Sequence, residues 1–199
     1  FSFFCQPNAM RGREVDGLAN MLAAHMDLDN LKHQPLVQQF WHSPTIAKQV
    51  GLKAVDLFEA VEAGKIKAIW IMATNPVVSL PNADQVKRAL EKCEFVVVSD
   101  ICLDTDTTQY ADVLLPALGW GEKDGTVTNS ERRISRQRAF LDIPEQAQAD
   151  WWSVSQVAKK LGFQGFDFES SHDIFKEHAQ LSAYQNAEID LRSSTETFR

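Results

Sequence analysis

The amino-acid sequence predicts an α/β domain of Rossmann-like, three-layer type, with a mostly parallel sheet and helices on both faces. Three short apolar runs predict its strands: Ala68–Met72, Phe95–Val98 and Val113–Leu115. A short, continuous apolar run is typical of a strand buried on both faces, as in a parallel sheet. An amphipathic segment separates the first two runs, and right-handed crossovers between parallel strands are the simplest arrangement of that order.

Five segments show the apolar spacing of an amphipathic helix. They span residues 13–26, 53–62, 82–93, 151–161 and 172–181. Gly64 is expected to end the second helix, since glycine is favoured just beyond a helix C-terminus. Asn82 is expected to cap the third, with Gln85 three residues later completing a capping-box pattern. Between the last strand and the fourth helix, Thr126–Phe140 alternates β-branched and arginine residues and is predicted to be extended.

The chain has 199 residues, enough for one domain or slightly more. We expect an N-terminal helical segment over residues 1–50, packed on the α/β domain or leading into it. The α/β domain itself is expected over residues 51–182. The polar tail, 183–199, is expected to be disordered or to order only against a missing partner.

Composition excludes several classes of function. A formal net charge of −7 argues against nucleic-acid binding, which requires a basic face. The local arginine cluster is interpreted as a strand with solvated or salt-bridged side chains. It comprises Arg132, Arg133, Arg136 and Arg138. No apolar run approaches the roughly 20 residues of a membrane helix, and no secretory signal is visible.

The three cysteines, Cys5, Cys93 and Cys102, are scattered and form no C-x-x-C pair. A zinc or iron–sulfur site within this chain is therefore not expected. An odd number of cysteines without a signal sequence favours a reducing cytoplasm. Cys93 continues the apolar stripe of the third predicted helix and is expected to be a core residue.

Polar residues follow the predicted strands, where ligands bind in open α/β sheets. Asn75 follows the first strand, Ser99 and Asp100 end the second, and Lys123 lies in the loop after the third. A carboxylate there can accept hydrogen bonds from ribose hydroxyls or from the N1 and N2 donors of guanine. A lysine suits a phosphate. The set predicts a nucleotide site, although neither G-x-G-x-x-G nor a P-loop motif occurs.

Each candidate also has a purely structural interpretation. Asn75 precedes Pro76 and could serve only to shape a turn. Asp100 could close the loop that follows it, and Lys123 could pair with Glu122. Asp150 stands just before a predicted helix, where an aspartate is a good N-cap.

Several blocks resemble the molybdopterin oxidoreductase family, which includes nitrate reductases, formate dehydrogenases and dimethyl sulfoxide reductase. Residues 6–15 are similar to a segment typical of assimilatory nitrate reductases. The further blocks are Ile69–Pro76, Val98–Asp100, Tyr110–Pro116, Trp120–Lys123 with Gly125 and Thr126, and Asn129–Arg133. Their order and spacing carry the resemblance, which extends to about residue 182.

The resemblance implies a molybdenum cofactor with two molybdopterin guanine dinucleotides, of which this domain would contact one guanosine end. The family positions that contact the cofactor match Asn75, Ser99, Asp100, Lys123 and Asp150. No residue of this chain is assigned as catalytic or as a metal ligand. The iron–sulfur cluster and the molybdenum-ligating cysteine are expected in other parts of a longer polypeptide, so that this segment alone would be inactive.

The implied function is reduction of nitrate to nitrite by an assimilatory nitrate reductase. The implied partners are the remaining domains of the same polypeptide and an electron donor: ferredoxin, flavodoxin or an NADH-linked reductase. A formate dehydrogenase of the same family is the first alternative. A stand-alone nucleotide-binding or regulatory module is the second. A nicotinamide-dependent enzyme is disfavoured by the missing glycine fingerprint.

Overall fold

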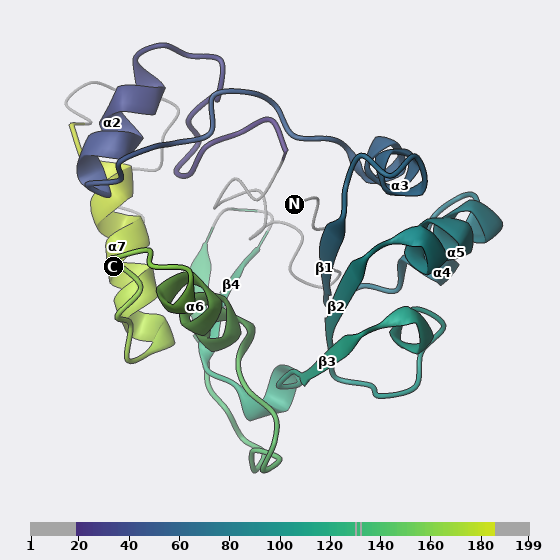
Figure 1. The fold of residues 1–199 in the computed structure, drawn as a ribbon. Helices are drawn as coiled ribbons and strands as arrows, with labels where there is room; N and C mark the ends of the chain where they lie inside the picture. Colours follow the sequence, from purple (N-terminus) through teal and green to yellow (C-terminus); the bar gives the residue numbers. More distant parts are fainter. Residues whose placement is uncertain (1–18, 130, 132, 186–199) are drawn as a thin grey trace. The chain divides into compact units, whose positions relative to one another are not determined.

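The computed structural model describes residues 19–185 apart from 130 and 132 (Figure 1). The chain divides into two compact units. One comprises residues 52–123 and 139–157, and the other takes in residues up to 51, 124–138 and those from 158 onward. Each unit is therefore built from stretches that are separate in sequence.

A three-stranded parallel sheet organises the first of these units. Its strands are β1 (Ala68–Met72), β2 (Phe95–Asp100) and β3 (Val113–Pro116), in the order β1-β2-β3. Ile71 pairs with Val98, and Val98 pairs with Leu114. The expected α/β fold with a parallel sheet is confirmed, and all three apolar runs form strands.

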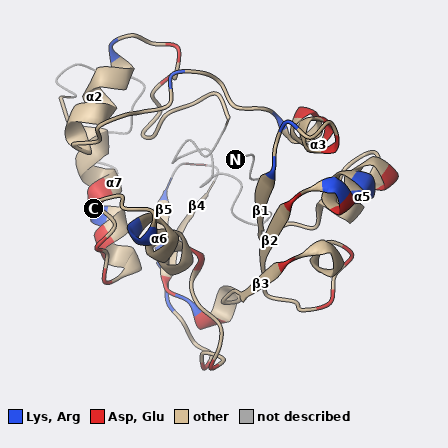
Figure 2. Cartoon of the chain, in the orientation of Figure 1, with Lys and Arg blue, Asp and Glu red and all other residues tan. Residues whose placement is uncertain are grey.

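Helices α3 (Ala54–Glu62), α4 (Pro76–Ser79) and α5 (Ala83–Lys92) lie together on one side of this sheet (Figure 1). Alternate residues of β1 and β2 point toward them and form the core with the apolar stripes of the helices. The buried core residues include Phe58, Val61, Ile71, Val86, Ala89, Leu90, Val96 and Val98. Cys93 packs against this core as predicted. Helices α3 and α5 carry many of the charged residues of this unit (Figure 2).

The strands are not buried along their whole length, contrary to the expectation from their apolar runs. Phe95, Val113 and Leu114 have exposed fractions of 46%, 37% and 39%. Two of the three belong to β3, which is an edge strand of the described sheet and therefore has a strand neighbour on one side only. A continuous apolar run does not distinguish an edge strand from a central one.

The predicted end of α3 and the Asn82 cap of α5 are confirmed, whereas the side chain of Gln85 completes no capping box. Gly64 has a φ of +70°, and its N–H donates to the carbonyl of Val61 at 2.9 Å, while Lys65 N–H donates to Ala60 at 2.9 Å. This pair of bonds is a Schellman motif, which places glycine where an L side chain would be strained. At α5, Asn82 Oδ1 accepts a hydrogen bond from the backbone N–H of Gln85 at 3.2 Å.

The other unit contains α2 (His33–Phe40), α7 (Ser171–Ala183) and an antiparallel hairpin of β4 (Gly125–Thr128) and β5 (Ile134–Gln137). Val37 of α2 and Leu181 of α7 share a core with residues of the 22–28 segment. Arg136 of β5 pairs with Asp124 at 3.1 Å, with both side chains largely exposed. The interpretation of this arginine as a salt-bridged strand residue is thus confirmed. Helix α6 (Asp150–Lys160) runs from one unit into the other.

One N-terminal expectation needs correction, and one helix of this region was not predicted. Residues 13–18 of the first predicted helix lie outside the described residues, and residues 19–26 are not helical. Ala24 and His25 have φ values of 57° and 59°, which an α-helix cannot accommodate, and Met21 forms a bridge with Asp27. Helix α2 was not predicted, because its apolar residues are too few to mark a stripe. Of the predicted tail, 183–199, residues 186–199 also lie outside the described part.

Candidate functional site at the carboxyl edge of the sheet

Four chain segments meet in order along the carboxyl edge of the parallel sheet. The N–H of Ala73, just after β1, donates to the carbonyl of Ser99 at 3.0 Å. The N–H of Ala117, just after β3, donates to the carbonyl of Asp100 at 3.0 Å. Beyond β3, Gln148 continues the pairing as a parallel bridge with Ala117. The five predicted site residues all belong to these segments or directly follow them, and all lie in one compact unit.

Asn75 begins the short helix α4, and its side chain does not cap that helix. Its Oδ1 instead accepts a hydrogen bond from the hydroxyl of Thr107 at 2.6 Å. The same hydroxyl accepts the N–H of Val77 at 3.3 Å. The structural interpretation of Asn75 as only a turn residue therefore misses a side-chain bond that spans 32 positions of sequence.

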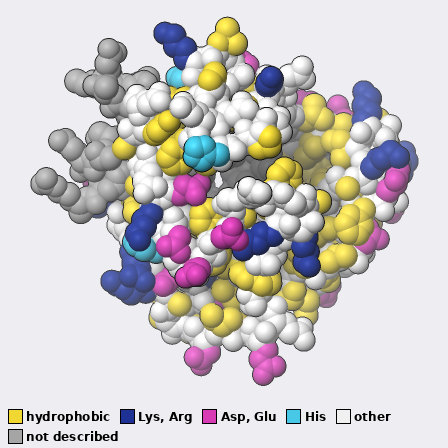
Figure 3. All heavy atoms as spheres, turned by 60° about the vertical axis from the view of Figure 1, so that its left-hand side comes forward, with side chains coloured by type: hydrophobic (Ala, Val, Ile, Leu, Met, Phe, Trp, Pro, Cys, Tyr) yellow, Lys and Arg dark blue, Asp and Glu magenta, His cyan; other side chains and the backbone are white. Residues whose placement is uncertain are grey.

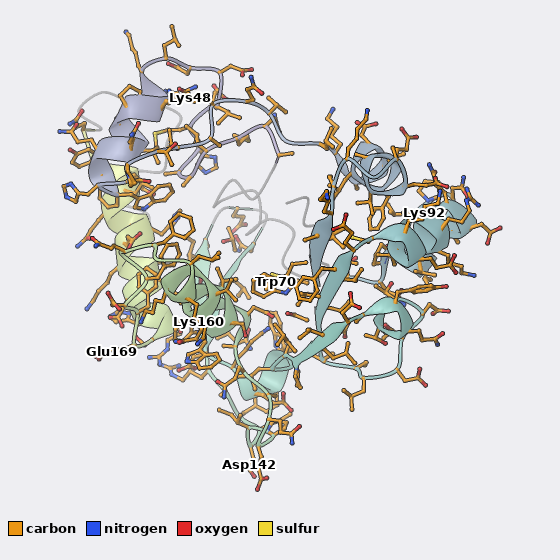
Figure 4. The ribbon with its side chains drawn as sticks, viewed as in Figure 1. Lys48, Trp70, Lys92, Asp142, Lys160 and Glu169 are labelled. Carbon is orange, nitrogen blue, oxygen red and sulfur yellow. The ribbon has the colours of Figure 1, made fainter. Side chains whose placement is uncertain are left out.

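Ser99 lies on the face of the sheet away from α3 and α5, and only 2% of it is exposed. The indole N–H of Trp70 donates to its Oγ at 2.8 Å. Trp70 extends from β1 on the side of the sheet opposite to those helices (Figure 4). The hydroxyl of Ser99 thus accepts from Trp70 and retains its own hydrogen for donation.

Asp100 is the last residue of β2, directly opposite Pro116 of β3. Its Oδ1 accepts the N–H of Cys102 at 3.0 Å, which closes the following loop as the structural interpretation predicted. This short-range bond fixes the orientation of the carboxylate. The second carboxylate oxygen has the free lone pairs that a ligand with two N–H or O–H donors would need.

Lys123 and Asp150 form an ion pair, with Lys123 Nζ at 3.5 Å from Asp150 Oδ2. About a third of each side chain is exposed, at 32% and 33%. Glu122, the partner considered for Lys123 from sequence, accepts the N–H of Gly119 at 2.7 Å. Asp150 is the first residue of α6 rather than its N-cap, because the carbonyl of Ala149 accepts the first helical bonds, from Trp152 and Ser153.

The other oxygen of Asp150 is unusual. Oδ1 is buried and has no hydrogen-bond partner in the described part of the chain. Leaving a buried carboxylate oxygen unsatisfied costs about 1–3 kcal/mol or more. An oxygen in this state, beside a lysine that suits phosphate and at the edge where nucleotides bind, fits a site completed by a ligand with hydrogen-bond donors.

The site therefore offers acceptors and donors in a pattern suited to a nucleotide. The carboxylates of Asp100 and Asp150 are acceptors, Lys123 supplies positive charge, and Asn75 and Ser99 supply neutral groups. Among the described residues, no group of three His, Cys, Asp or Glu side chains is arranged to hold a metal ion.

Sequence reasoning missed two residues that support the site, Trp70 and Thr107. Trp70 was assigned only to an apolar run, although its register opposite Val97 places it on the same face as Ser99. Thr107 gives no sequence signal, because its contact with Asn75 depends on how the loop after β2 returns to the start of α4. Alternation along β1 could have suggested the first of these bonds and not the second.

The surface is mixed in character. Figure 3 shows acidic and basic side chains interspersed with apolar ones on the face that it presents. No helix in the described part of the chain has the length and apolar character needed to cross a membrane.

Comparison with known proteins gives a consistent result. A family model for molybdopterin oxidoreductases matches residues 6–160. A nitrate reductase of Shewanella frigidimarina is 60% identical over 183 residues, which are 92% of this chain and 19% of the relative. The assimilatory nitrate reductase catalytic subunit of Bacillus subtilis is 34% identical over 180 residues, 89% of this chain and 25% of that protein.

A third relative has another substrate in its name. The F420-dependent formate dehydrogenase subunit alpha of Methanocaldococcus jannaschii is 36% identical over 193 residues, 93% of this chain and 28% of that protein. The chain thus spans roughly a fifth to a quarter of the length of these relatives.

Proposed function

Since the chain belongs to the molybdopterin oxidoreductase family, we propose that it is the part of an assimilatory nitrate reductase that holds the guanosine end of a molybdopterin guanine dinucleotide. The family match implies a molybdopterin cofactor. The guanine dinucleotide form is supported by the nucleotide-like pattern of donors and acceptors at the sheet edge. The buried, unpartnered Oδ1 of Asp150 is the observation that carries this assignment most directly.

Each residue has a distinct role in this proposal. The free carboxylate oxygens of Asp100 and Asp150 accept hydrogen bonds from guanine N1 and N2 or from ribose hydroxyls. Lys123 is held by Asp150 at 3.5 Å and supplies positive charge to a phosphate. Asn75 and the hydroxyl of Ser99 complete the polar lining.

The reaction of the whole protein is the two-electron reduction of nitrate, in which nitrate and two protons give nitrite and water. The molybdenum centre, when bound, supplies the redox chemistry, while the protein supplies orientation and electrostatics. The residues of this chain bind and orient the cofactor. We further propose a cytoplasmic enzyme that receives electrons through an iron–sulfur cluster held elsewhere in the polypeptide. Its donor would be ferredoxin, flavodoxin or an NADH-linked reductase.

Nitrate is favoured over formate by the relative with the highest identity quoted above, 60% against 36% for the formate dehydrogenase subunit. The formate alternative is tested by assaying the full-length protein that carries this segment with both substrates. Formate oxidation without nitrate reduction would reject the nitrate proposal and leave the cofactor site unaffected.

Chemical-shift mapping of the 199-residue chain with GMP and AMP tests the site itself. GMP is expected to shift resonances around Asp100, Lys123 and Asp150 more strongly than AMP. Asp100→Ala should remove most of this response. Asp104→Ala is the matched control, because Asp104 is an exposed carboxylate in the loop that follows Asp100. A stronger response to AMP, or equal loss in both variants, would contradict the proposed guanosine site.

A further inference from the structure

We propose that Thr107 is a positioning residue that locks the side-chain amide of Asn75 with its NH2 group directed at the ligand. Asn75 then acts only as a donor and requires a hydrogen-bond acceptor on the bound nucleotide. This inference rests on the proposed nucleotide site and adds the polarity of one of its contacts.

The hydrogen-bond inventory of the Thr107 hydroxyl decides the orientation. A threonine hydroxyl has one hydrogen to donate and two lone pairs to accept. The N–H of Val77 can only donate, so it occupies one lone pair, at 3.3 Å. Thr107 is completely buried, with an exposed fraction of 0%. Its hydrogen therefore needs an acceptor within the protein, and Asn75 is the one that the described residues provide.

The opposite orientation of the amide fails this inventory. If the NH2 group of Asn75 faced Thr107, both bonds would enter lone pairs of the hydroxyl. Its hydrogen would then be buried without an acceptor, which proteins rarely tolerate. The separation of 2.6 Å agrees with the first orientation, since O–H···O bonds are centred near 2.7–2.8 Å and N–H···O bonds near 2.9–3.0 Å.

The orientation of the Asn75 amide determines which groups it presents to a ligand. With its oxygen bound by Thr107, Asn75 presents two N–H donors, and as a half-buried residue it has surface through which to reach a ligand. The carboxylate of Asp100, at the end of the neighbouring strand, presents an acceptor. The sheet edge thus offers an outward donor after β1 and an outward acceptor after β2. A guanine base or a phosphate oxygen can supply the acceptor that Asn75 requires.

Four variants of the 199-residue chain separate positioning from folding. Thr107→Val removes the hydroxyl and keeps the shape, whereas Thr107→Ser keeps the hydroxyl. Asn75→Asp keeps the oxygen that Thr107 binds and replaces the outward donor by an acceptor. Thr108→Val is the matched control. Its hydroxyl is also buried and bonded, to the Thr105 carbonyl at 2.9 Å and the Thr105 N–H at 2.8 Å, without touching Asn75.

The first measurement needs no ligand. In NMR spectra of the free chain, the Asn75 NH2 protons are expected to exchange freely with water. The Thr107 hydroxyl proton is expected to be protected. Protection of the NH2 protons by Thr107, with a freely exchanging hydroxyl, would overturn the inferred orientation whether or not the chain binds nucleotides.

The second measurement is affinity for guanosine and GMP. Thr107→Val should weaken binding about fivefold, and Thr107→Ser should restore it to within about twofold of wild type. Asn75→Asp should weaken binding at least about tenfold. Thr108→Val should lower thermal stability as Thr107→Val does and leave affinity unchanged. A loss with GMP alone identifies a phosphate acceptor, and a loss with guanosine as well identifies the base or ribose.

Equal affinity for Thr107→Val and wild type would overturn the positioning role. Tighter binding by Asn75→Asp would overturn the donor role. Absence of any nucleotide binding by the wild-type chain would instead count against the proposed nucleotide site, and the exchange measurement would then still decide the orientation of Asn75.

Discussion

Removing either partner of the Lys123–Asp150 ion pair is expected to change stability unequally. Asp150 has one oxygen bonded to Lys123 and one buried oxygen without a partner. In Lys123→Met, the carboxylate loses its bond to the lysine while its buried oxygen stays unsatisfied. The free energy of unfolding is expected to fall by up to about 1 kcal/mol, the worth of a partly exposed ion pair, because the buried oxygen is unsatisfied in both chains.

Asp150→Ala removes several terms at once. The chain loses a partly exposed ion pair worth about 0–1 kcal/mol. It also loses a carboxylate in the first turn of α6, worth about 0.3–1 kcal/mol through the helix dipole. Against these, it loses the unsatisfied buried oxygen, whose cost was about 1–3 kcal/mol. The terms nearly cancel, so Asp150→Ala is expected within about 1 kcal/mol of wild type, or above it.

Urea unfolding of the two single variants and the double variant checks this expectation. The double variant should have the same free energy of unfolding as Asp150→Ala, because Met at position 123 then faces no carboxylate. The same Asp150→Ala chain should nonetheless lose most of its chemical-shift response to GMP. If Asp150→Ala is less stable than Lys123→Met by more than about 1 kcal/mol, Asp150 is a structural residue and the inferred ligand role of its free oxygen is wrong.

Three further perturbations test the fold that holds the site. Gly64→Ala should lower the free energy of unfolding by about 1 kcal/mol, because the added Cβ meets nothing within 4 Å and the cost comes only from the φ of +70°. Urea unfolding measures this loss, and a loss beyond about 3 kcal/mol would contradict the open surroundings of Gly64. The hydrogen bond from Arg88 lowers the pKa of Glu62 below 4.5. The stability that this bond contributes is therefore complete above pH 4.5 and is lost as the pH falls through the lowered pKa. The difference in Tm between wild type and Glu62→Gln should shrink on acidification, and a difference that grows would refute this. Trp70→Phe should lower the free energy of unfolding by about 1–3 kcal/mol, because it leaves the buried hydroxyl of Ser99 without its indole donor. In a Ser99→Ala background the same substitution should cost much less, and a double-mutant cycle measures the difference.

Local signals carried most of the successful predictions. The apolar runs located β1, β2 and β3, and glycine at position 64 marked the end of α3, because strand and helix patterns depend on neighbouring residues. The helix predicted from apolar spacing over 13–26 is wrong over its described residues, 19–26, because the left-handed conformations of Ala24 and His25 break the helical repeat. Helical spacing is necessary for an amphipathic helix but does not exclude a compact turn.

The site, too, has features that the sequence predicted and features that it could not predict. Asp100 and Lys123 were identified because they follow strands, and strand ends converge in a parallel sheet. The bonds from Trp70 to Ser99 and from Thr107 to Asn75 join residues 29 and 32 positions apart. Such contacts depend on register and on the return path of a loop, which no local pattern encodes. The position of the unpartnered Asp150 oxygen likewise required the packing around α6.

The place where the chain leaves and re-enters the sheet-bearing unit is closed by the unit's own hydrogen bonds. It leaves after Lys123 and returns at Ala139. Close to these crossing points, the N–H groups of Phe140 and Leu141 both donate to the carbonyl of Gly121, at 2.8 and 2.9 Å. A segment whose two ends meet so closely leaves the host unit closed behind it, and such places tolerate inserted segments. Residues 124–138 are therefore a side excursion from this unit, and the carboxyl edge of the sheet does not depend on them for closure.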